Sequence, residues 1–306
     1  MSRRPKRALR LAAGGAVLLG MGSCNLALPE TAPPQALAAD PSPPVADPPP
    51  QPAGAIALSG ECEQGGWARG RAPAGTVSLA LDGKAIPVAR DGAFFIAFDR
   101  DAGASASLVA TLDDGHTVRR DIAIAPRAWE IERLDIPMKP GKMPSEEFLR
   151  IRKGELAQIN AARALRTDAD GWREKFIWPV EGRISGKFGA QRIYQGVAGS
   201  YHSGIDIATG TSGTPIVAPA DGVVILAAQD PFTLEGHLLM IDHGMGLNSA
   251  FLHCSELEVK VGEHVRQGQF IARIGMTGRA TGPHLHWSVK WDAARLDPLL
   301  LAGPMP

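Results

Sequence analysis

Two histidines alternate with apolar residues in the segment Gly282-Pro283-His284-Leu285-His286-Trp287, and this alternation strongly restricts the backbone there. In an extended strand, alternate side chains point to the same face, so both histidines would face one side and the residues between them the other. A second segment, His202-Ser203-Gly204-Ile205-Asp206, has its first and last side chains an even number of residues apart. If extended, it also presents them on one face. We therefore expect half-buried β-strands that carry imidazole and carboxylate groups on one side.

These side chains are of the kind that bind a catalytic metal ion. Together the two segments can supply three zinc ligands and leave one coordination position open, whereas structural zinc sites are usually closed by four ligands, mostly cysteine. A lone His-x-His is weak evidence, because a histidine on such a face is more often a core residue. The combination of both segments with nearby glycines favours a metal site, since these glycines allow tight turns around a groove (Gly204, Gly275, Gly278, Gly282).

The N-terminus has the pattern of an export signal. Five basic residues and no acidic residue precede the apolar run from Leu11 to Gly22 (Arg3, Arg4, Lys6, Arg7, Arg10). This run is too short to span a bilayer as a mature helix, so residues 1–24 are predicted to be a signal peptide. The whole chain has 32 basic and 32 acidic residues. Removal of the signal peptide takes away basic residues and no acidic ones, so the remaining protein is mildly acidic. That charge disfavours nucleic-acid binding, which needs a basic patch.

Cys24 follows Met21-Gly22-Ser23, which resembles a bacterial lipobox, where the cysteine is lipidated and becomes the first mature residue. The alternative is ordinary cleavage near Ala36-Leu37-Ala38, and both stay open. In either case we expect an exported, periplasmic protein. In the first case its contact with a membrane is limited to a lipid anchor at Cys24. Asn25, in place of an aspartate, resembles the sorting pattern of lipoproteins anchored to the outer membrane.

The next two segments differ in composition. Residues 25–54 are rich in proline and alanine and contain few large apolar side chains, so they are predicted to be a tether. Residues 55–127 contain short β-like runs separated by the turn dipeptides Asp82-Gly83, Asp91-Gly92 and Asp114-Gly115. Repeated strands with such turns at about ten-residue spacing predict a small β-sandwich domain.

Residues 128–175 are predicted to be a linker that contains a helix from Ser145 to about Leu165. Glu146 and Glu147 give this helix an acidic first turn. Apolar residues recur near the helical period (Phe148, Ile151, Leu156, Ile159, Ala162). Residues 176–301 contain only short strands and glycine turns and are predicted to form an antiparallel-β domain with no helix. The predicted fold class is therefore mostly β, with one linking helix.

Several stretches of the C-terminal domain carry a resemblance to a known family. They are Ser203-Gly204-Ile205-Asp206-Ile207-Ala208, the segments 213–224 and 261–269, and above all Gly275-Met276-Thr277-Gly278-Arg279-Ala280-Thr281-Gly282-Pro283-His284-Leu285-His286. On these residues the region 176–301, about two fifths of the chain, is similar to the lysostaphin-type, LytM-like zinc metallopeptidase family, whose members cut peptides of bacterial peptidoglycan. The resemblance implies a LytM-like peptidase domain and a zinc metalloendopeptidase.

Carried over by position, the resemblance makes His202, Asp206 and His286 the ligands of one zinc ion per chain. It makes His253 and His284 the catalytic histidines that do not bind the metal. Zinc lowers the pKa of a bound water towards about 7 and polarises the scissile carbonyl. The two histidines could orient this water and move its proton to the leaving amine, because imidazole titrates in the needed range. Their division of roles stays open.

The implied substrate is the peptide stem of peptidoglycan. A D,D-endopeptidase acting on diaminopimelate-type cross-links is the first reading, and glycine bridges are the alternative substrate. A non-catalytic LytM-like activator or recruiter of another cell-wall hydrolase is the alternative function, although the complete set of five residues argues against it. A biotinyl- or lipoyl-carrier module is a further alternative, but no attachment lysine lies between Val223 and Gly236.

The remaining candidates have simpler interpretations. The other histidines are expected to be structural or solvated (His116, His237, His243, His264). Arg192 and Tyr194 could contact substrate carboxylate or amide groups, or could be surface residues of a loop. Asp221 is expected to shape the turn that it forms with Gly222.

Overall fold

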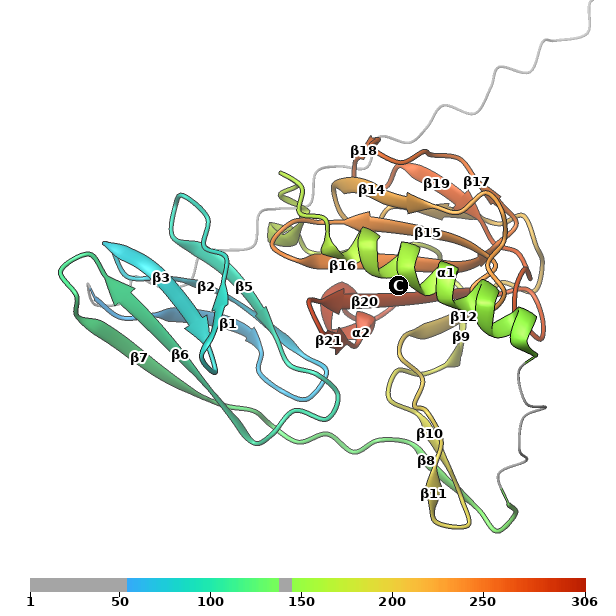
Figure 1. The fold of residues 1–306 in the computed structure, drawn as a ribbon, viewed down its shortest axis with the longest axis horizontal. Coiled ribbons are helices and arrows are strands. Elements are labelled where there is room, and N and C mark those ends of the chain that lie inside the picture. The colour runs from blue at the N-terminus through green and yellow to red at the C-terminus, as the bar shows by residue number, and fades with distance from the viewer. Residues whose placement is uncertain (1–53, 138–144) are drawn as a thin grey trace, which may run out of the picture. The chain divides into compact units, whose positions relative to one another are not determined.

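The computed structural model describes residues 54–137 and 145–306 as a mostly β protein (Figure 1). The predicted fold class is therefore confirmed. The predicted signal peptide with Cys24, and residues 25–53 of the predicted tether, lie outside the described residues. Within the described residues, we find no helix that combines the length and the apolar character needed to cross a membrane.

The N-terminal β region has two antiparallel sheets. One has the strand order β1-β2-β5, with bounds Ala57–Glu61, Trp67–Arg71 and Ala93–Ala97. The other has the order β4-β3-β6-β7, with bounds Lys84–Ile86, Thr76–Leu81, Ser105–Leu112 and Thr117–Ala123. Gly83 and Gly115 occupy two of the predicted turns with positive φ, a conformation that glycine adopts without a steric penalty. The exact domain boundaries remain a prediction.

Every residue of β5 is buried, because this strand has apolar neighbours on both faces. Phe95 stacks on Trp67 with ring centroids 5.9 Å apart, and it also approaches Trp291 of the C-terminal region at 6.4 Å. Phe94 and Leu79 belong to the same buried core. The apolar run that predicted a strand is therefore explained by burial on both sides.

The C-terminal region is built on a large antiparallel sheet that carries the polar segments of interest. Its path is β18-β14-β15-β16-β20-β12-β9, with β21 also paired to β20. The bounds in that order are His264–Val265, Gly222–Ala227, His237–Asp242, Leu247–Cys254, Leu285–Trp291, Ile205–Ala208, Arg183–Gly186 and Ala294–Leu296. Figure 1 shows β20 between β16 and β12, so the two segments with the predicted site lie on, or lead into, neighbouring strands of one sheet.

Two smaller sheets complete the β structure. One has the order β13-β19-β17, with bounds Pro215–Val217, Phe270–Arg273 and Glu256–Leu257. The other has the order β11-β10-β8, with bounds Val197–Ala198, Gln191–Tyr194 and Ile131–Leu134. The second sheet joins a strand of the predicted linker to a hairpin of the C-terminal region.

The predicted helix is α1, which spans Glu146–Ala164 and lies across the large sheet (Figure 1). The Ser145 side chain caps it by accepting a hydrogen bond from the Phe148 N–H. Ile159 and Ala162 pack on the sheet as expected. Leu156 is 41% exposed, whereas Glu155 is buried. The inward face of the helix therefore differs from the apolar pattern, because Glu155 makes hydrogen bonds there that replace its contacts with water.

Two short helices were not expected from the sequence. Residues Gly171–Arg173 form a 3-10 turn, and Pro298–Ala302 form α2. The prediction of no helix after residue 176 was wrong for α2. Its local signals are those of a helix start, because the Asp297 carboxylate accepts a hydrogen bond from the Leu299 N–H and Pro298 occupies the first turn. Asp297 also pairs with Arg127 at 2.8 Å.

Candidate metal centre

Asp206 and His286 face each other across neighbouring strands. In the antiparallel pairing of β12 with β20, Asp206 is directly opposite His286, and such pairs bring side chains on one face into contact. Ile205 and Ile207 are 2% and 0% exposed on the opposite face of β12. The predicted separation of a polar face from a core face is therefore present in these strands.

His202 reaches the site from outside a strand. An extended segment from His202 to Asp206 would put both side chains on one face, but β12 begins only at Ile205. Two backbone hydrogen bonds hold His202 instead: its N–H donates to the Ala190 carbonyl, and its own carbonyl accepts from the Gly189 N–H, both at 2.8 Å. The loop that carries Ala190 therefore positions His202.

Three potential ligand atoms converge in the structure. The Nε2 atom of His202 lies 3.1 Å from Oδ1 of Asp206 and 3.0 Å from Nδ1 of His286. Nδ1 of His286 lies 2.8 Å from the same carboxylate oxygen. The three residues are half-buried, and their ligand atoms all lie within 4.8 Å of one another. Two imidazole nitrogens and one carboxylate oxygen in this arrangement fit a zinc ion that retains an open position.

Two glycines leave the space that this cluster needs. A Cβ atom at Gly186 would lie 2.4 Å from Oδ2 of Asp206, and a Cβ atom at Gly204 would lie 2.8 Å from Nε2 of His286. Any larger residue at either position would therefore displace a potential ligand. The sequence indicated the role of Gly204 in close approach, but it gave no signal for Gly186.

Backbone carbonyl groups orient three of the imidazole rings. The Nδ1 atom of His202 lies 3.0 Å from the Lys187 carbonyl oxygen. The Nδ1 atom of His253 lies 2.9 Å from the Thr277 carbonyl oxygen, and that of His284 lies 2.8 Å from the Gly282 carbonyl oxygen. A carbonyl oxygen only accepts, so each Nδ1 carries a proton, and Nε2 keeps its lone pair in the neutral form of each ring. These carbonyl groups could not be predicted from the sequence, because backbone acceptors have no residue signature.

His253 and His284 lie together beside the three potential ligands. Their ring centroids are 4.9 Å apart, and the centroid of His253 is 6.4 Å from that of His286. Nε2 of His284 lies 3.7 Å from Oδ1 of Asp206. His253 is 7% exposed and has a φ of 64°, which is uncommon outside glycine. The structure therefore brings together all five side chains singled out from the sequence.

The protonation states in the cluster follow from burial and from hydrogen bonds. Burial alone raises the pKa of Asp206, but hydrogen bonds from His202 and His286 outweigh it and hold the pKa well below its usual range. Burial lowers the pKa of His286 and of His253. For His202 burial also lowers the pKa, yet its hydrogen bond to Asp206 gives a net rise. At neutral pH the cluster therefore contains an ionised carboxylate and neutral imidazoles at His253 and His286.

The other candidate residues lie elsewhere. His243 is fully buried between the Asp221 carbonyl and the Ser249 hydroxyl, at 2.8 Å from each. Asp221 accepts a hydrogen bond from the Gln267 N–H at 2.7 Å, so it joins two turns. The remaining three histidines lie outside the cluster, on strand ends or in a turn (His116, His237, His264). These positions agree with the structural roles expected for His243 and Asp221.

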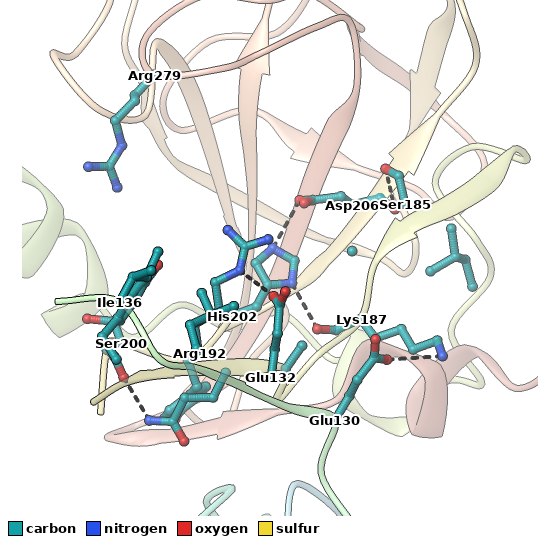
Figure 2. Close-up of a pocket in the computed structure, with 18 of the residues that line it drawn as sticks. Glu130, Glu132, Ile136, Ser185, Lys187, Arg192, Ser200, His202, Asp206 and Arg279 are labelled. Atoms are coloured by element: carbon teal, nitrogen blue, oxygen red, sulfur yellow. Dashed lines mark hydrogen bonds and ion pairs between the residues drawn. The ribbon is translucent and has the colours of Figure 1, made fainter. Parts of the chain in front are cut away.

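A cleft of about 1060 Å³ leads to His202 and Asp206. Its lining includes Arg192 and Tyr194, as one interpretation of the sequence required, and also Arg279, for which no role was predicted from the sequence. Figure 2 labels Arg192 and Arg279 among the residues that line this cleft. The cleft is large enough to hold a peptide beside the five-residue cluster.

Comparison with known proteins agrees with this geometry. Residues 200–298 match the model of peptidase family M23. A peptidoglycan DD-endopeptidase of Vibrio cholerae, ShyA, is 37% identical over 115 residues, which cover 37% of this chain and 26% of the relative. An uncharacterized metalloprotease of Haemophilus influenzae is 35% identical over 126 residues, which cover 40% of this chain and 26% of the relative. The chain thus spans about a quarter of the length of these two curated relatives.

One solved structure is similar over most of the chain. A Pseudomonas aeruginosa crystal structure named for peptidase M23 has a TM-score of 0.60 and 27% sequence identity. The similarity covers 79% of this chain and 95% of that one. Residues 200–298 of this chain therefore match an M23 peptidase domain, and the chain shares its fold with a structure named for that family, as the resemblance in its sequence implied.

Proposed function

We propose that this protein is a zinc-dependent endopeptidase that hydrolyses peptide cross-links of bacterial peptidoglycan, of the D,D-endopeptidase type. The convergence of His202, Asp206, His286, His253 and His284 beside an open cleft carries the proposal. The match to peptidase family M23 and the relative named as a peptidoglycan DD-endopeptidase support the reaction and the substrate class.

In this proposal, Nε2 of His202, Oδ1 of Asp206 and Nδ1 of His286 hold one zinc ion. When bound, zinc supplies Lewis-acid activation of water and of the scissile carbonyl. Asp206 provides the negative charge of the site, because its lowered pKa keeps it ionised. The hydrogen bond from His202 to the Lys187 carbonyl fixes the ring so that Nε2 points to the metal position.

His253 and His284 perform the proton transfers in this scheme. In each ring the Nδ1–H donates a hydrogen bond to a backbone carbonyl, so the free Nε2 atom can accept a proton from the attacking water and deliver it to the leaving amine. Burial lowers the pKa of His253, so its ring is neutral and able to accept a proton at neutral pH. Once one ring has accepted this proton, its Nε2–H can stabilise the oxyanion until the proton passes to the leaving amine.

Digestion of purified sacculi tests the proposal. The full-length protein is incubated with sacculi with zinc, and in parallel with a chelator, and the released muropeptides are identified by mass. We expect cross-linked dimers to be cut at the D-alanyl bond only when zinc is available. Binding to sacculi without any cleavage would instead favour the alternative, a non-catalytic LytM-like activator or recruiter of another hydrolase. Cleavage that is insensitive to the chelator would contradict the metal assignment.

We further propose that the protein is exported to the periplasm and anchored to the outer membrane by a lipid at Cys24. The basic residues and apolar run before Cys24 support export, and peptidoglycan is reached from that compartment. Labelling of cells with a fatty-acid analogue should mark the wild-type protein and not a Cys24→Ser variant. Absence of label on both proteins would exclude the anchor and favour ordinary cleavage near Ala36-Leu37-Ala38, and equal labelling of both would place the lipid at another residue.

A further inference from the structure

The linker strand β8 forms one wall of the cleft. It pairs in parallel with β10, so that Glu132 is in register with Arg192 and Leu134 with Tyr194. These four side chains all line the cleft that contains His202 and Asp206. Strand β8 lies outside residues 200–298, which match the peptidase family. The wall is therefore a feature of this chain that the peptidase domain alone does not supply.

Contacts on both sides of β8 hold the wall in place. Just before the strand, the Trp129 ring packs edge-on against Phe188 with centroids 5.8 Å apart, and the guanidinium of Arg100 lies 5.1 Å from the Trp129 ring centroid. Backbone hydrogen bonds extend the pairing, from Gln191 N–H to the Glu130 carbonyl and from Gln195 N–H to the Leu134 carbonyl, both at 2.9 Å. The linker thus has a defined position along the cleft.

The charges of the cleft lining differ in how they are paired. Arg192 pairs with Glu132 at 2.7 Å, and Lys187 pairs with Glu130 at 3.2 Å. All four of these side chains are more than half exposed, so their ion pairs contribute little and can exchange partners. Arg279 lines the same cleft and has no ion pair within residues 54–137 and 145–306. Figure 2 shows its guanidinium apart from the Glu132–Arg192 pair.

We propose that Arg192 and Arg279 form a subsite that binds a free carboxylate of an extended peptide substrate, with β8 as the wall on which the peptide lies. This inference rests on the proposed endopeptidase function and names the chemistry that the cleft selects. A planar guanidinium binds a carboxylate through two parallel hydrogen bonds. Arg279 is available for this directly, and Arg192 becomes available by exchanging Glu132 for the substrate carboxylate.

The apolar part of the wall contributes in a different way. Ile136 is 51% exposed and lines the cleft together with Leu134 and Pro137. A peptide lying on these side chains would bury them whatever its charge. The arginines would therefore decide which peptides bind, and the apolar residues would strengthen the binding of all of them.

A pair of synthetic cross-linked peptides tests this subsite. One carries a free carboxylate next to the scissile bond, and the other carries a carboxamide at that position. Their dissociation constants are measured by calorimetry on the zinc-loaded His253→Ala variant, and their cleavage is measured on the wild-type protein. We expect the carboxylate peptide to bind about tenfold more tightly, in line with a charge-assisted hydrogen bond. Adding either Arg192→Gln or Arg279→Gln to the His253→Ala variant should reduce this preference for the carboxylate peptide.

Two controls separate the subsite from a general loss of binding. Ile136→Ser should weaken both peptides by the same factor of a few, and the exposed Arg266→Gln, outside the cleft lining, should change neither. The subsite is overturned if the His253→Ala protein with both arginines intact binds the two peptides equally. It is also overturned if neither arginine substitution changes the preference, even if both peptides are cleaved. If the wild-type protein cleaves neither peptide nor sacculi, the endopeptidase function fails, and the subsite fails with it.

Discussion

Arg152 of α1 forms a bidentate ion pair with Glu235, with nitrogen–oxygen distances of 2.6 and 2.7 Å. The backbone carbonyl of Glu235 accepts the N–H of His253 at 2.8 Å. Arg152 also contacts Glu155, which accepts two hydrogen bonds from Thr233 in the same loop. A helix outside the family match thus fixes the loop that holds a proposed catalytic histidine.

We expect Arg152→Gln to lower kcat about ten- to a hundredfold, because small displacements of a reacting group are costly. KM and zinc content should change little, since Arg152 contacts neither the cleft lining nor the three proposed ligands. Steady-state kinetics and atomic absorption measure these quantities. Arg150→Gln is the matched control, because Arg150 makes an exposed ion pair with Glu147 on the same helix. Equal effects of both substitutions would contradict a positioning role for Arg152.

His202 and His253 should differ in what their removal abolishes. His202→Ala deletes a proposed ligand, so the purified variant should lose its zinc. His253→Ala should keep zinc and lose turnover by about 10²- to 10⁴-fold, the range of general acid–base catalysis. Zinc content and turnover are measured on the same preparations. Equal zinc content with full activity in both variants would refute the assignment.

The sequence predicted the parts of the site that depend on strand alternation. Asp206 and His286 lie in strands with buried neighbours, and a period of two is readable from residue types alone. The position of His202 could not be predicted in this way, because it depends on backbone hydrogen bonds to a loop. The pairing of β8 with β10 could not be predicted either, because it joins segments about sixty residues apart. Hydrogen bonds to backbone carbonyls, such as that of Lys187, leave no pattern in the sequence. Burial of Glu155 was missed for a related reason, because its partners lie in a distant loop.

Gly204 should be intolerant of any side chain. A Cβ atom there would lie 2.5 Å from the Trp287 carbonyl oxygen and 2.8 Å from Nε2 of His286, so the ring or its strand must shift. We expect Gly204→Ala to weaken zinc binding at least about tenfold, as loss of ligand orientation does. Zinc affinity is measured by competition with a chromogenic chelator.

Gly282→Ala is the control for this substitution. Gly282 lies in the segment that leads to His284, its φ is not positive, and a Cβ atom there would meet nothing within 4 Å. Its zinc affinity should equal that of the wild type. If Gly204→Ala also binds zinc normally, the ligand cluster must be more adaptable than these contacts imply.

His243 should make stability depend on pH. Burial lowers its pKa from 6.5 to about 4 in the folded protein, despite the hydrogen bond to the Asp221 carbonyl. The unfolded chain then binds more protons between these values, so stability is complete above about pH 6.5 and falls as pH drops towards 4. The shift corresponds to a loss of up to roughly 3 kcal/mol.

Urea unfolding of the metal-free protein between pH 7.5 and 4 (about the range over which this histidine changes charge) measures the effect. The free energy of unfolding of a folded His243→Gln variant should be lower at pH 7.5, since buried hydrogen bonds are altered, yet it should fall less steeply as the pH drops. Other groups titrate in both proteins, so the difference between the two slopes isolates His243. Parallel pH profiles would show that His243 is already protonated in the folded protein, or that its site opens to water before the chain unfolds.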